Sequence, residues 1–363
     1  MANRLDSANY RRVPAPQKKN GQMREVYSPS RDVRLIQKRI VEVFFKNRTV
    51  IKWPGFIFGG IHKSALQAGD VRDHVACAKV HCQAKSLLKL DIEDFFGNVN
   101  FDLVMGVFSG LLGWSEDVAT LAARLCTRDG RLPQGGITSS YIALLCLYDV
   151  EPKLVRILNY KRLSYTRYVD DITVSSKSSS YDFESIIKMI DRCLVDKGLT
   201  INPSKIDQQT VGLRALSVHG LNISFERPVL PKSEVRRIKS VCKQTAMDAK
   251  DVGRRTAVYL KRYSRAMGLV NKLARVGNAE HKKFVRQLNS VRPLPSYADY
   301  LISTDIGLDL RSRYMERKSD YWYWRRFNKL MSRLDLIGIE NPGWAKNLRN
   351  YMRSHFRPEF DFK

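Results

Sequence analysis

The sequence has few cysteines, no long apolar run and a marked shortage of acidic residues. Its six cysteines among 363 residues form no CxxC pair and no zinc-binding spacing with histidine, which excludes a disulfide scaffold and a zinc finger. No segment approaches the ~18 apolar residues of a membrane-spanning helix, and residues 1–6 lack the apolar core of a signal peptide. We therefore expect a cytoplasmic protein with reduced thiols.

Composition otherwise indicates a folded protein with one large domain or two to three modest ones. The hydrophobic fraction is 44% and the charged fraction is 27%. The unusual quantity is the net charge of +27, which comes from 63 basic and 36 acidic residues. A positive field of this size makes a polyanion the expected partner. Because no segment could span a bilayer, we favour nucleic acid and predict no membrane partner.

The excess positive charge is unevenly distributed along the chain. The net charge is +10 over residues 1–69, zero over 70–230, +13 over 231–292 and +4 over 293–363. We interpret the neutral block as a catalytic body and the basic blocks beside it as elements that grip nucleic acid. The alternative is that the basic residues only solvate surface helices.

Hydrophobic patterns predict a mixed α/β region followed by a mostly helical one. A buried strand is expected over residues 86–91 and a strand pair over 163–176. The other expected elements are a hairpin around 14–29, an amphipathic helix from residue 32, helices over 138–150 and 183–198, strands at 199–201 and 216–225, and helices from residue 231 onward.

Three carboxylates stand at the ends of apolar strands. Asp91 ends the strand over 86–91, and Asp170 and Asp171 lie in a turn between two further strands. Like charges held together near a hydrophobic core repel strongly, and divalent metal relieves that cost. Two Mg²⁺ ions on such oxygens suit an in-line phosphoryl transfer. The alternative for the acidic pair is an ordinary polar turn.

Four short motifs occur together in a recognisable order. They are Asp91–Phe96 (DIEDFF), Leu132–Gly135 (LPQG), Tyr168–Asp171 (YVDD) and Gly198–Lys205 (GLTINPSK). With these motifs the sequence resembles the reverse transcriptase family, and within it the bacterial retron enzymes. The resemblance runs from about Pro14 to Leu288.

The resemblance implies an α/β (α+β) chain with the right-hand polymerase fold. Residues 1–75 would form the N-terminal part of the fingers. Residues 76–230 would form the palm, an antiparallel sheet with helices, together with the remaining fingers elements. Residues 231–292 would form a basic helical thumb, and residues 293–363 a helical extension rich in aromatic and basic residues.

The same resemblance assigns roles to individual metal-site residues. Asp91 and Asp170 would bind two Mg²⁺ ions, with Asp171 as a further ligand or electrostatic partner. Ile92, next to Asp91, belongs to the implied metal-binding set.

A second group of residues would bind the incoming dNTP. Phe96 would be the steric gate against a ribose 2′-hydroxyl, and Gln134 would lie against the nascent base pair. Lys19, or its neighbour Lys18, would reach the triphosphate together with Arg24. Lys205 is a candidate proton donor to pyrophosphate. The bland alternatives are that Phe96 is plain core and Lys205 a solvated surface lysine.

Nucleic acid would be held mainly by the basic block over 231–292. The residues implied are Arg254, Arg255, Arg262, Lys272, Lys282, Lys283 and Arg286. The aromatic segment 321–327 offers base stacking, although helical spacing would place about half of its rings in a core.

Two histidines lie in segments that resemble retron elements with substitutions. Cys77 stands where these enzymes usually have Asn, four residues before His81, and His219 stands where they have Thr between Val218 and Gly220. The resemblance implies a role in priming or RNA positioning for His81 and His219. A satisfied structural histidine is the alternative.

The resulting functional hypothesis is an RNA-directed DNA polymerase in the bacterial cytoplasm. It would copy its own structured non-coding RNA from a 2′-hydroxyl primer into branched RNA–DNA (msDNA), in phage defence with an effector protein encoded nearby. The alternatives are a reverse transcriptase of the group II intron, diversity-generating or solitary defence kind, and an RNA-binding scaffold with an inactive palm. The oligomeric state is not indicated by the sequence.

Overall fold

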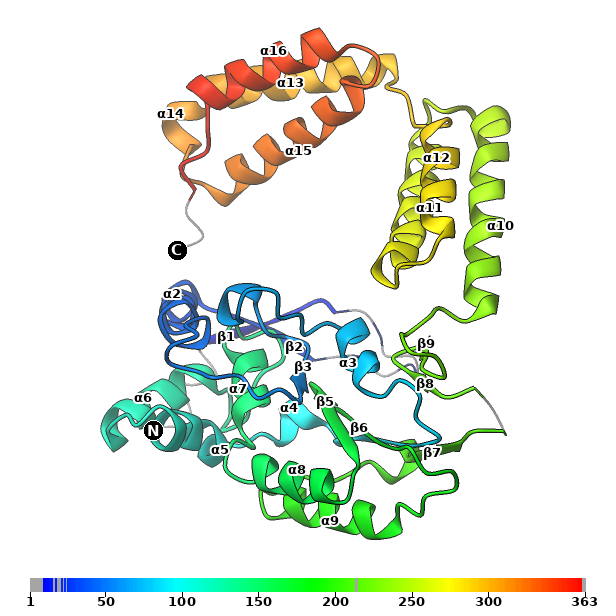
Figure 1. Cartoon of the computed structure of the whole chain (residues 1–363). Coiled ribbons are helices and arrows are strands. Elements are labelled where there is room, and N and C mark those ends of the chain that lie inside the picture. Colours follow the sequence, from blue (N-terminus) through cyan, green and yellow to red (C-terminus); the bar gives the residue numbers. More distant parts are fainter. Residues whose placement is uncertain are drawn as a thin grey trace. The chain divides into compact units, whose positions relative to one another are not determined.

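The computed structural model describes residues 9–15, 17, 21, 23, 25–212 and 215–360. Figure 1 shows the chain, which divides into two compact units, Met1–Val229 and Leu230–Lys363. No helix in the described ranges is long and apolar enough to cross a bilayer.

The centre of the first unit is a five-stranded sheet in the order β3-β5-β6-β4-β7. The strands are β3 (Ile57–Phe58), β4 (Ser86–Asp91), β5 (Ser164–Tyr168), β6 (Asp171–Ser176) and β7 (Asp207–Thr210). All neighbouring pairs are antiparallel except β3 with β5, which is parallel. The expected antiparallel sheet is thus present, and at one edge the short strand β3 is added in parallel, which its long connection to β5 allows.

Helices cover both faces of this sheet, which explains why β4 and β6 are almost entirely buried. Neighbouring residues of a strand face opposite sides. On β5, Tyr165 bonds to Glu151 of α8 (Glu151–Tyr160), whereas Thr166 bonds to His81 at the end of α3 (His74–Val80). Figure 1 shows α8 and α9 (Glu184–Val195) on one face and α3 on the other.

The expected N-terminal hairpin and helix are both present. β1 (Tyr10–Val13) pairs antiparallel with β2 (Val26–Pro29), and α2 (Arg31–Ile40) continues into a π-helical turn η1 (Val41–Phe45). The buried Gln37 amide fixes α2 in place: its nitrogen donates to the Tyr10 hydroxyl and to the Leu125 carbonyl, and its oxygen accepts from the Ile137 amide.

The remaining elements of this unit are short. They are η2 (Lys63–Ala65), α4 (Phe95–Asn98), α5 (Phe101–Gly106), η3 (Val107–Leu111), α6 (Glu116–Cys126), α7 (Ser139–Leu145), η4 (Pro203–Lys205), β8 (Ser217–Val218) and β9 (Leu221–Asn222).

Two expected elements are shorter than the pattern indicated. The helix over 138–150 ends at Leu145, because Pro152 cannot continue a helix and starts α8 instead. The strand at 199–201 is reduced to a single bridge between Ile92 and Ile201, since Pro203 removes the backbone donor that a longer ladder would need.

The second unit contains two helical bundles with separate cores. The first bundle consists of α10 (Lys232–Asp248), a π-helical turn η5 (Ala249–Gly253), α11 (Ala257–Arg275) and α12 (Glu280–Asn289). Its core contains Ile238, Cys242, Ala266, Val270, Leu273, Phe284 and Leu288. These residues form the apolar faces that the amphipathic helices of this bundle bury against one another.

The C-terminal bundle consists of α13 (Tyr297–Ser312), α14 (Tyr314–Arg317), α15 (Tyr321–Ile337) and α16 (Pro342–His355). Ser296 and Asp299 form a capping box at the start of α13. Of the aromatic residues over 321–327, Tyr323 and Phe327 lie in the core, as helical spacing predicted for about half of them.

Candidate active site

The hairpin between β5 and β6 brings the three carboxylates to one end of the sheet. Asp91, the last residue of β4, pairs directly with Asp171, the first residue of β6. Val169 and Asp170 form the two-residue loop between Tyr168 and Asp171. The Ile92 amide donates to the Asp170 carbonyl at 3.0 Å, which fixes the loop against the end of β4.

This loop contains an unfavourable backbone conformation. Val169 has a φ of +59°, a left-handed value that costs free energy for a β-branched residue. A two-residue hairpin of the type that matches strand twist requires a positive φ at this position. The surrounding structure must therefore hold Val169 in place.

A fully buried ion pair supplies that support. The guanidinium of Arg167, fully buried, bonds to both carboxylate oxygens of Glu151 at 2.6 and 2.7 Å. The Tyr165 hydroxyl donates to the same carboxylate at 2.8 Å. Arg167 Nη2, which bonds to Glu151, also donates to the Leu144 carbonyl oxygen at 2.8 Å, and Nη1 donates to the Val169 carbonyl oxygen at 3.0 Å. The guanidinium thus joins α7, α8 and the strained loop.

The electrostatics of the carboxylates favour a cation. Burial, together with the charges of Asp170 and Asp91, raises the pKa of Asp171 to about 6. The pKa of Asp170 is also raised, first by burial and then by Asp91. Lys205 Nζ donates to Asp91 Oδ2 at 2.7 Å, and this hydrogen bond raises the pKa of Lys205. One ammonium therefore faces three carboxylates.

The carboxylate oxygens of this site suit hard divalent ions, although they do not enclose a metal ion completely. Among the residues that the structure describes, no three His, Cys, Asp or Glu side chains form a preformed metal-binding group. Carboxylate oxygens at a partly open site are nevertheless the ligands that Mg²⁺ prefers when it keeps waters and substrate phosphates as further ligands. The raised pKa values of Asp170 and Asp171 reflect charge that such an ion would compensate.

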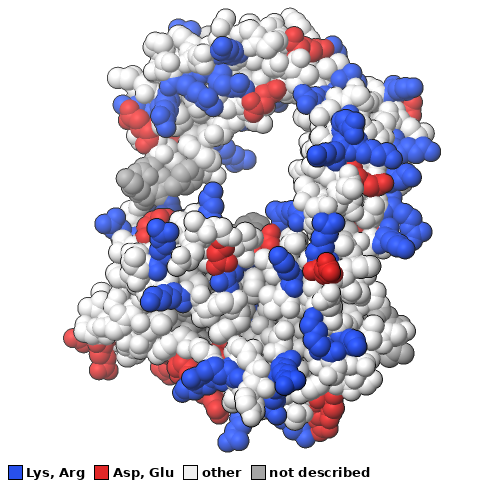
Figure 2. Space-filling model, viewed as in Figure 1, with Lys and Arg blue, Asp and Glu red and all other residues white. Residues whose placement is uncertain are grey.

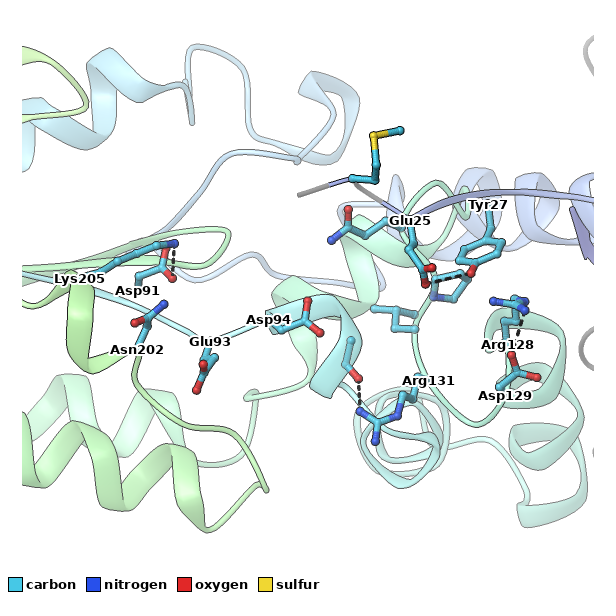
Figure 3. Close-up of a pocket in the computed structure, with 15 residues that line it drawn as sticks. Glu25, Tyr27, Asp91, Glu93, Asp94, Arg128, Asp129, Arg131, Asn202 and Lys205 are labelled. Carbon is cyan, nitrogen blue, oxygen red and sulfur yellow. Dashed lines mark hydrogen bonds and ion pairs between the residues drawn. The ribbon is translucent and has the colours of Figure 1, made fainter. Parts of the chain in front are cut away.

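Two adjoining cavities open beside the carboxylates. The larger has a volume of about 720 Å³, and its lining includes Asp91, Lys205 and Gln134. Figure 3 shows Lys205 pointing to Asp91 on one side of this cavity and Arg128 and Arg131 on the other. The cavity thus combines acidic and basic side chains, which is suitable for a metal-bound phosphate ester.

The second cavity, of about 600 Å³, contains the predicted gate and base-pair residues. Its lining includes Asp91, Asp170, Phe96 and Gln134. Phe96 is half-buried on α4, and the Gln134 carbonyl accepts from the Tyr27 amide at 2.7 Å. Gly135 has a φ of +103°, and a Cβ there would lie 2.4 Å from the Tyr27 carbonyl oxygen, so only glycine fits this approach of the hairpin.

Sequence reasoning missed Arg128, Arg131 and Asn202, which line the larger cavity. The Arg128 guanidinium lies 3.9 Å from the Tyr27 ring centroid, and Arg131 donates to the Gly97 carbonyl at 2.7 Å. The sequence did offer one signal for this group, because the basic residues Arg128 and Arg131 stand shortly before the LPQG motif. Lys19 and Arg24, predicted to reach the triphosphate, lie outside the described residues, as does Lys18.

His81 is placed inside the protein and not at an RNA-binding surface. It is 1% exposed, and its Nδ1 and Nε2 atoms bond to the hydroxyls of Ser175 and Thr166 at 2.7 and 2.8 Å. Burial lowers the pKa of His81 to about 3. Both ring nitrogens are occupied by these hydroxyls, as in a satisfied structural histidine, and a role of His81 in priming or RNA positioning stays a prediction.

His219 lies against the YVDD motif. Its ring centroid is 4.6 Å from that of Tyr168, and its φ is +49°. Burial lowers the pKa of His219 to about 4, and its Nε2 is buried with no hydrogen-bond partner in the described structure. The His219 side chain therefore packs against the YVDD segment.

The seven predicted nucleic-acid-binding residues divide into two groups. Arg254, Arg255, Arg262 and Lys272 have partners within their own unit: respectively the Arg292 carbonyl, Glu340, Asp248 and Glu234. The three others, on α12, are exposed and in no ion pair among the described residues: Lys282, Lys283 and Arg286. Figure 2 shows Lys and Arg side chains gathered over α10 to α12.

Comparisons with known proteins define the class of this site. The family model "Reverse transcriptase (RNA-dependent DNA polymerase)" matches residues 16–236. The retron Ec48 reverse transcriptase of Escherichia coli is 39% identical over 85% of this chain and 76% of its own length. The retron Se72 reverse transcriptase of Salmonella heidelberg is 29% identical over 94% of this chain and 88% of its own.

Solved structures show a weaker likeness. A telomerase from Candida albicans in complex with a fragment of telomeric RNA covers 97% of this chain and 67% of its own, at 8% identity and a TM-score of 0.38. A likeness of this size carries no argument by itself.

The sequence matches and the acidic end of the palm sheet lead to one class. The chain belongs to the reverse transcriptase family and has its right-hand polymerase fold. More particularly, it is a retron-type RNA-directed DNA polymerase. The expected α/β fold class is thereby confirmed. The template of this polymerase is RNA.

Proposed function

We propose that Asp91, Asp170 and Asp171 form the catalytic centre for DNA synthesis, with Ile92 contributing through its backbone. The observation that carries this proposal is the direct pairing of Asp91 with Asp171 beside the Asp170 loop, with raised pKa values at the latter two. Two Mg²⁺ ions bound there would activate the primer hydroxyl and stabilise the leaving group.

The protein's own side chains would orient the nucleotide and move the proton. Phe96 and Gln134 line the cavity that holds Asp91 and Asp170, so they are placed to contact the sugar and the base pair. Lys205 Nζ is protonated and lies at the same carboxylate, where it can donate a proton to the departing pyrophosphate oxygen.

We further propose that this enzyme acts in the cytoplasm on its own structured non-coding RNA. It would prime from a 2′-hydroxyl, produce branched msDNA and serve phage defence with an effector protein. The names of the Ec48 and Se72 relatives support a retron system. The basic α10–α12 thumb supplies a surface suited to RNA phosphates.

The catalytic assignment is tested by Asp170→Asn combined with Asp171→Asn. The double variant should lose dNTP incorporation on a primed RNA template by at least about 10³-fold, since it removes the negative oxygens that hold the ions. RNA affinity, measured by filter binding, should stay within about twofold. Near wild-type extension by the variant would refute the assignment.

A further inference from the structure

Three guanidinium groups surround a single indole ring in the C-terminal bundle. The guanidinium carbons of Arg313, Arg317 and Arg326 lie 5.6, 4.5 and 5.4 Å from the Trp322 ring centroid. The arginines come from the end of α13, the end of α14 and the second turn of α15. The fold thus gathers them from separate elements.

Two carboxylates hold these arginines by their Nε atoms. Asp309 accepts from Arg313 Nε at 2.8 Å and forms an ion pair with Arg326 Nε. Arg317 Nε pairs with Asp320 at 3.0 Å. The structure records no acceptor for the Nη groups of the three arginines among the described residues. Each guanidinium is therefore anchored at one side and retains its terminal donors.

The charges in this cluster do not balance. Three cations face two carboxylates, and the three arginine side chains keep between 34% and 51% of their surface exposed. Crowding like charges around one ring costs free energy that cation–π attraction and Asp309 only partly offset. A phosphate accepts hydrogen bonds from guanidinium forks and would remove the remaining repulsion.

A second observation on the same helix indicates a nucleic acid as the source of the phosphate. Tyr321, on the first turn of α15, is 53% exposed and stacks with the half-buried Trp324, with ring centroids 5.8 Å apart and planes at 18°, and it also contacts Phe360. With 3.6 residues per turn, these two rings lie on a different face of α15 from Trp322 and Arg326. An exposed aromatic ring and anchored arginines on one helix offer base stacking and phosphate binding to the same strand. Figure 2 shows Lys and Arg side chains over α13 and α15.

We propose that Arg313, Arg317 and Arg326, supported by Trp322, form a binding site for the phosphate backbone of an RNA strand. The site lies outside residues 16–236, the segment that matches the polymerase family, so it serves a part of the RNA other than the template at the active site. This inference rests on the proposed function, because the RNA strand is taken to be part of the retron's own non-coding RNA.

The test compares two full-length variants of equal net charge. The site variant is R313Q/R317Q/R326Q, and the matched control is K329Q/K346Q/R353Q, three exposed cations of the same bundle with no contact to Trp322. The probe is an RNA hairpin with single-stranded flanks, titrated at several salt concentrations. The site variant should bind at least about tenfold more weakly than the control, with a salt slope shallower by about 2.

A second variant separates site geometry from charge. Trp322→Leu keeps every arginine but removes their common platform, so it should weaken the same RNA by about threefold or more with an unchanged melting temperature. Equal affinities of the site variant and the control would overturn the proposal, as would wild-type affinity of Trp322→Leu.

Failure of the proposed function has a different signature. Both triple variants should extend a short primed RNA template as the wild type does, because the active site is untouched. If the wild type itself extends no primer, the polymerase assignment fails while the binding comparison still decides the RNA site. If the site variant alone loses extension of the short template, the site belongs to template binding and our assignment of a separate RNA segment is wrong.

Discussion

Asp171 illustrates how the active site is built at the expense of stability. Its carboxylate is more than half buried beside Asp170 and Asp91, and burial with like-charge repulsion raises its pKa to about 6. A carboxyl whose pKa is raised in the folded state destabilises the fold once it ionises. The destabilisation is absent below the unfolded pKa near 4 and complete above pH 6.

Asp171→Asn should therefore raise the melting temperature of the metal-free protein at pH 7.5, by a few degrees. At about pH 3 the difference from wild type should nearly vanish, because the Asp171 carboxyl is then mostly protonated in both the folded and the unfolded state. Millimolar Mg²⁺ should stabilise the wild type more than the variant. Thermal unfolding followed by circular dichroism measures the melting temperature under all three conditions. A variant less stable than wild type at pH 7.5 would contradict the argument.

Arg167 supports the same site from inside the protein. Its guanidinium holds the Val169 carbonyl in the strained loop and is itself held by Glu151. Arg167→Lys keeps the positive charge, but an ammonium group cannot make the hydrogen bonds to both Glu151 and Val169 in the same geometry. We expect kcat for dNTP incorporation to fall about 10²-fold with KM for dNTP within about threefold, because the loop positions Asp170 and not the nucleotide.

The control for Arg167 is Tyr165→Phe, which removes a hydrogen bond to Glu151 but leaves the bonds from Arg167 to Glu151 and Val169 intact. It should keep kcat within about threefold. If both variants lose kcat in proportion to their loss of stability, Arg167 only stabilises the fold and does not position the loop.

A functional residue could be identified from the sequence only where a short motif around it indicates its role. Asp91, Asp170, Phe96 and Gln134 lie in short motifs, and the structure places all four around one cavity. The Arg167 partnership could not be found, because Glu151 is 16 positions away and nothing in the pattern around it distinguishes a buried acid from an exposed one. The burial of His81 was likewise not revealed by the sequence.

At the scale of elements, α12 carries a group of exposed cations that form no ion pair among the described residues. Its face toward the core is Phe284 and Leu288, and its exposed face carries Lys282, Lys283 and Arg286. Arg254 and Arg255 instead bond to the backbone of Arg292 and to Glu340. The α12 cations are therefore the better candidates for phosphate contacts.

Replacing Lys282, Lys283 and Arg286 with Gln should make the log–log salt dependence of binding to a primed RNA template shallower by about 2 to 3. Each contact that releases counterions contributes about 0.7 to 0.9 to the slope. The comparison variant is Arg255→Gln, which should change melting temperature more than slope, since its guanidinium bonds to Glu340. An unaltered slope for the α12 variant would place the duplex on another surface.

Elements with strong periodicity were predicted well and short ones poorly. The helix over 183–198 appears as α9, followed by Gly198 with a φ of +68°, because its apolar spacing and terminal glycine agree. β3 was missed because a two-residue strand carries no alternation to detect. The parallel pairing of β3 with β5 depends on tertiary contacts that no local pattern encodes.

At the scale of the whole molecule, the charge blocks and the two units share one boundary, near residue 230. The neutral residues 70–230 contain four of the five sheet strands and the carboxylates, and the basic residues 1–69, which include β3, belong to the same unit, while the basic α10–α12 bundle and the C-terminal bundle belong to the second unit. The polymerase family model ends at residue 236, so most of the second unit lies beyond the segment that this model matches. We propose that residues 237–360 contribute to recognition of one particular RNA.

This division leads to a prediction about what the enzyme carries in its host. A polymerase that reads the shape of one folded RNA and primes from its 2′-hydroxyl should copurify with a single abundant RNA joined to short single-stranded DNA. Treatment with a 2′–5′ debranching enzyme should release the DNA with a shift in gel mobility. The control is the Asp170→Asn and Asp171→Asn protein, which should copurify with the same RNA but without DNA, because the catalytic carboxylates are gone. A mixed population of RNAs, or DNA that is unbranched before treatment, would show that this chain synthesises DNA by another route than 2′-hydroxyl priming.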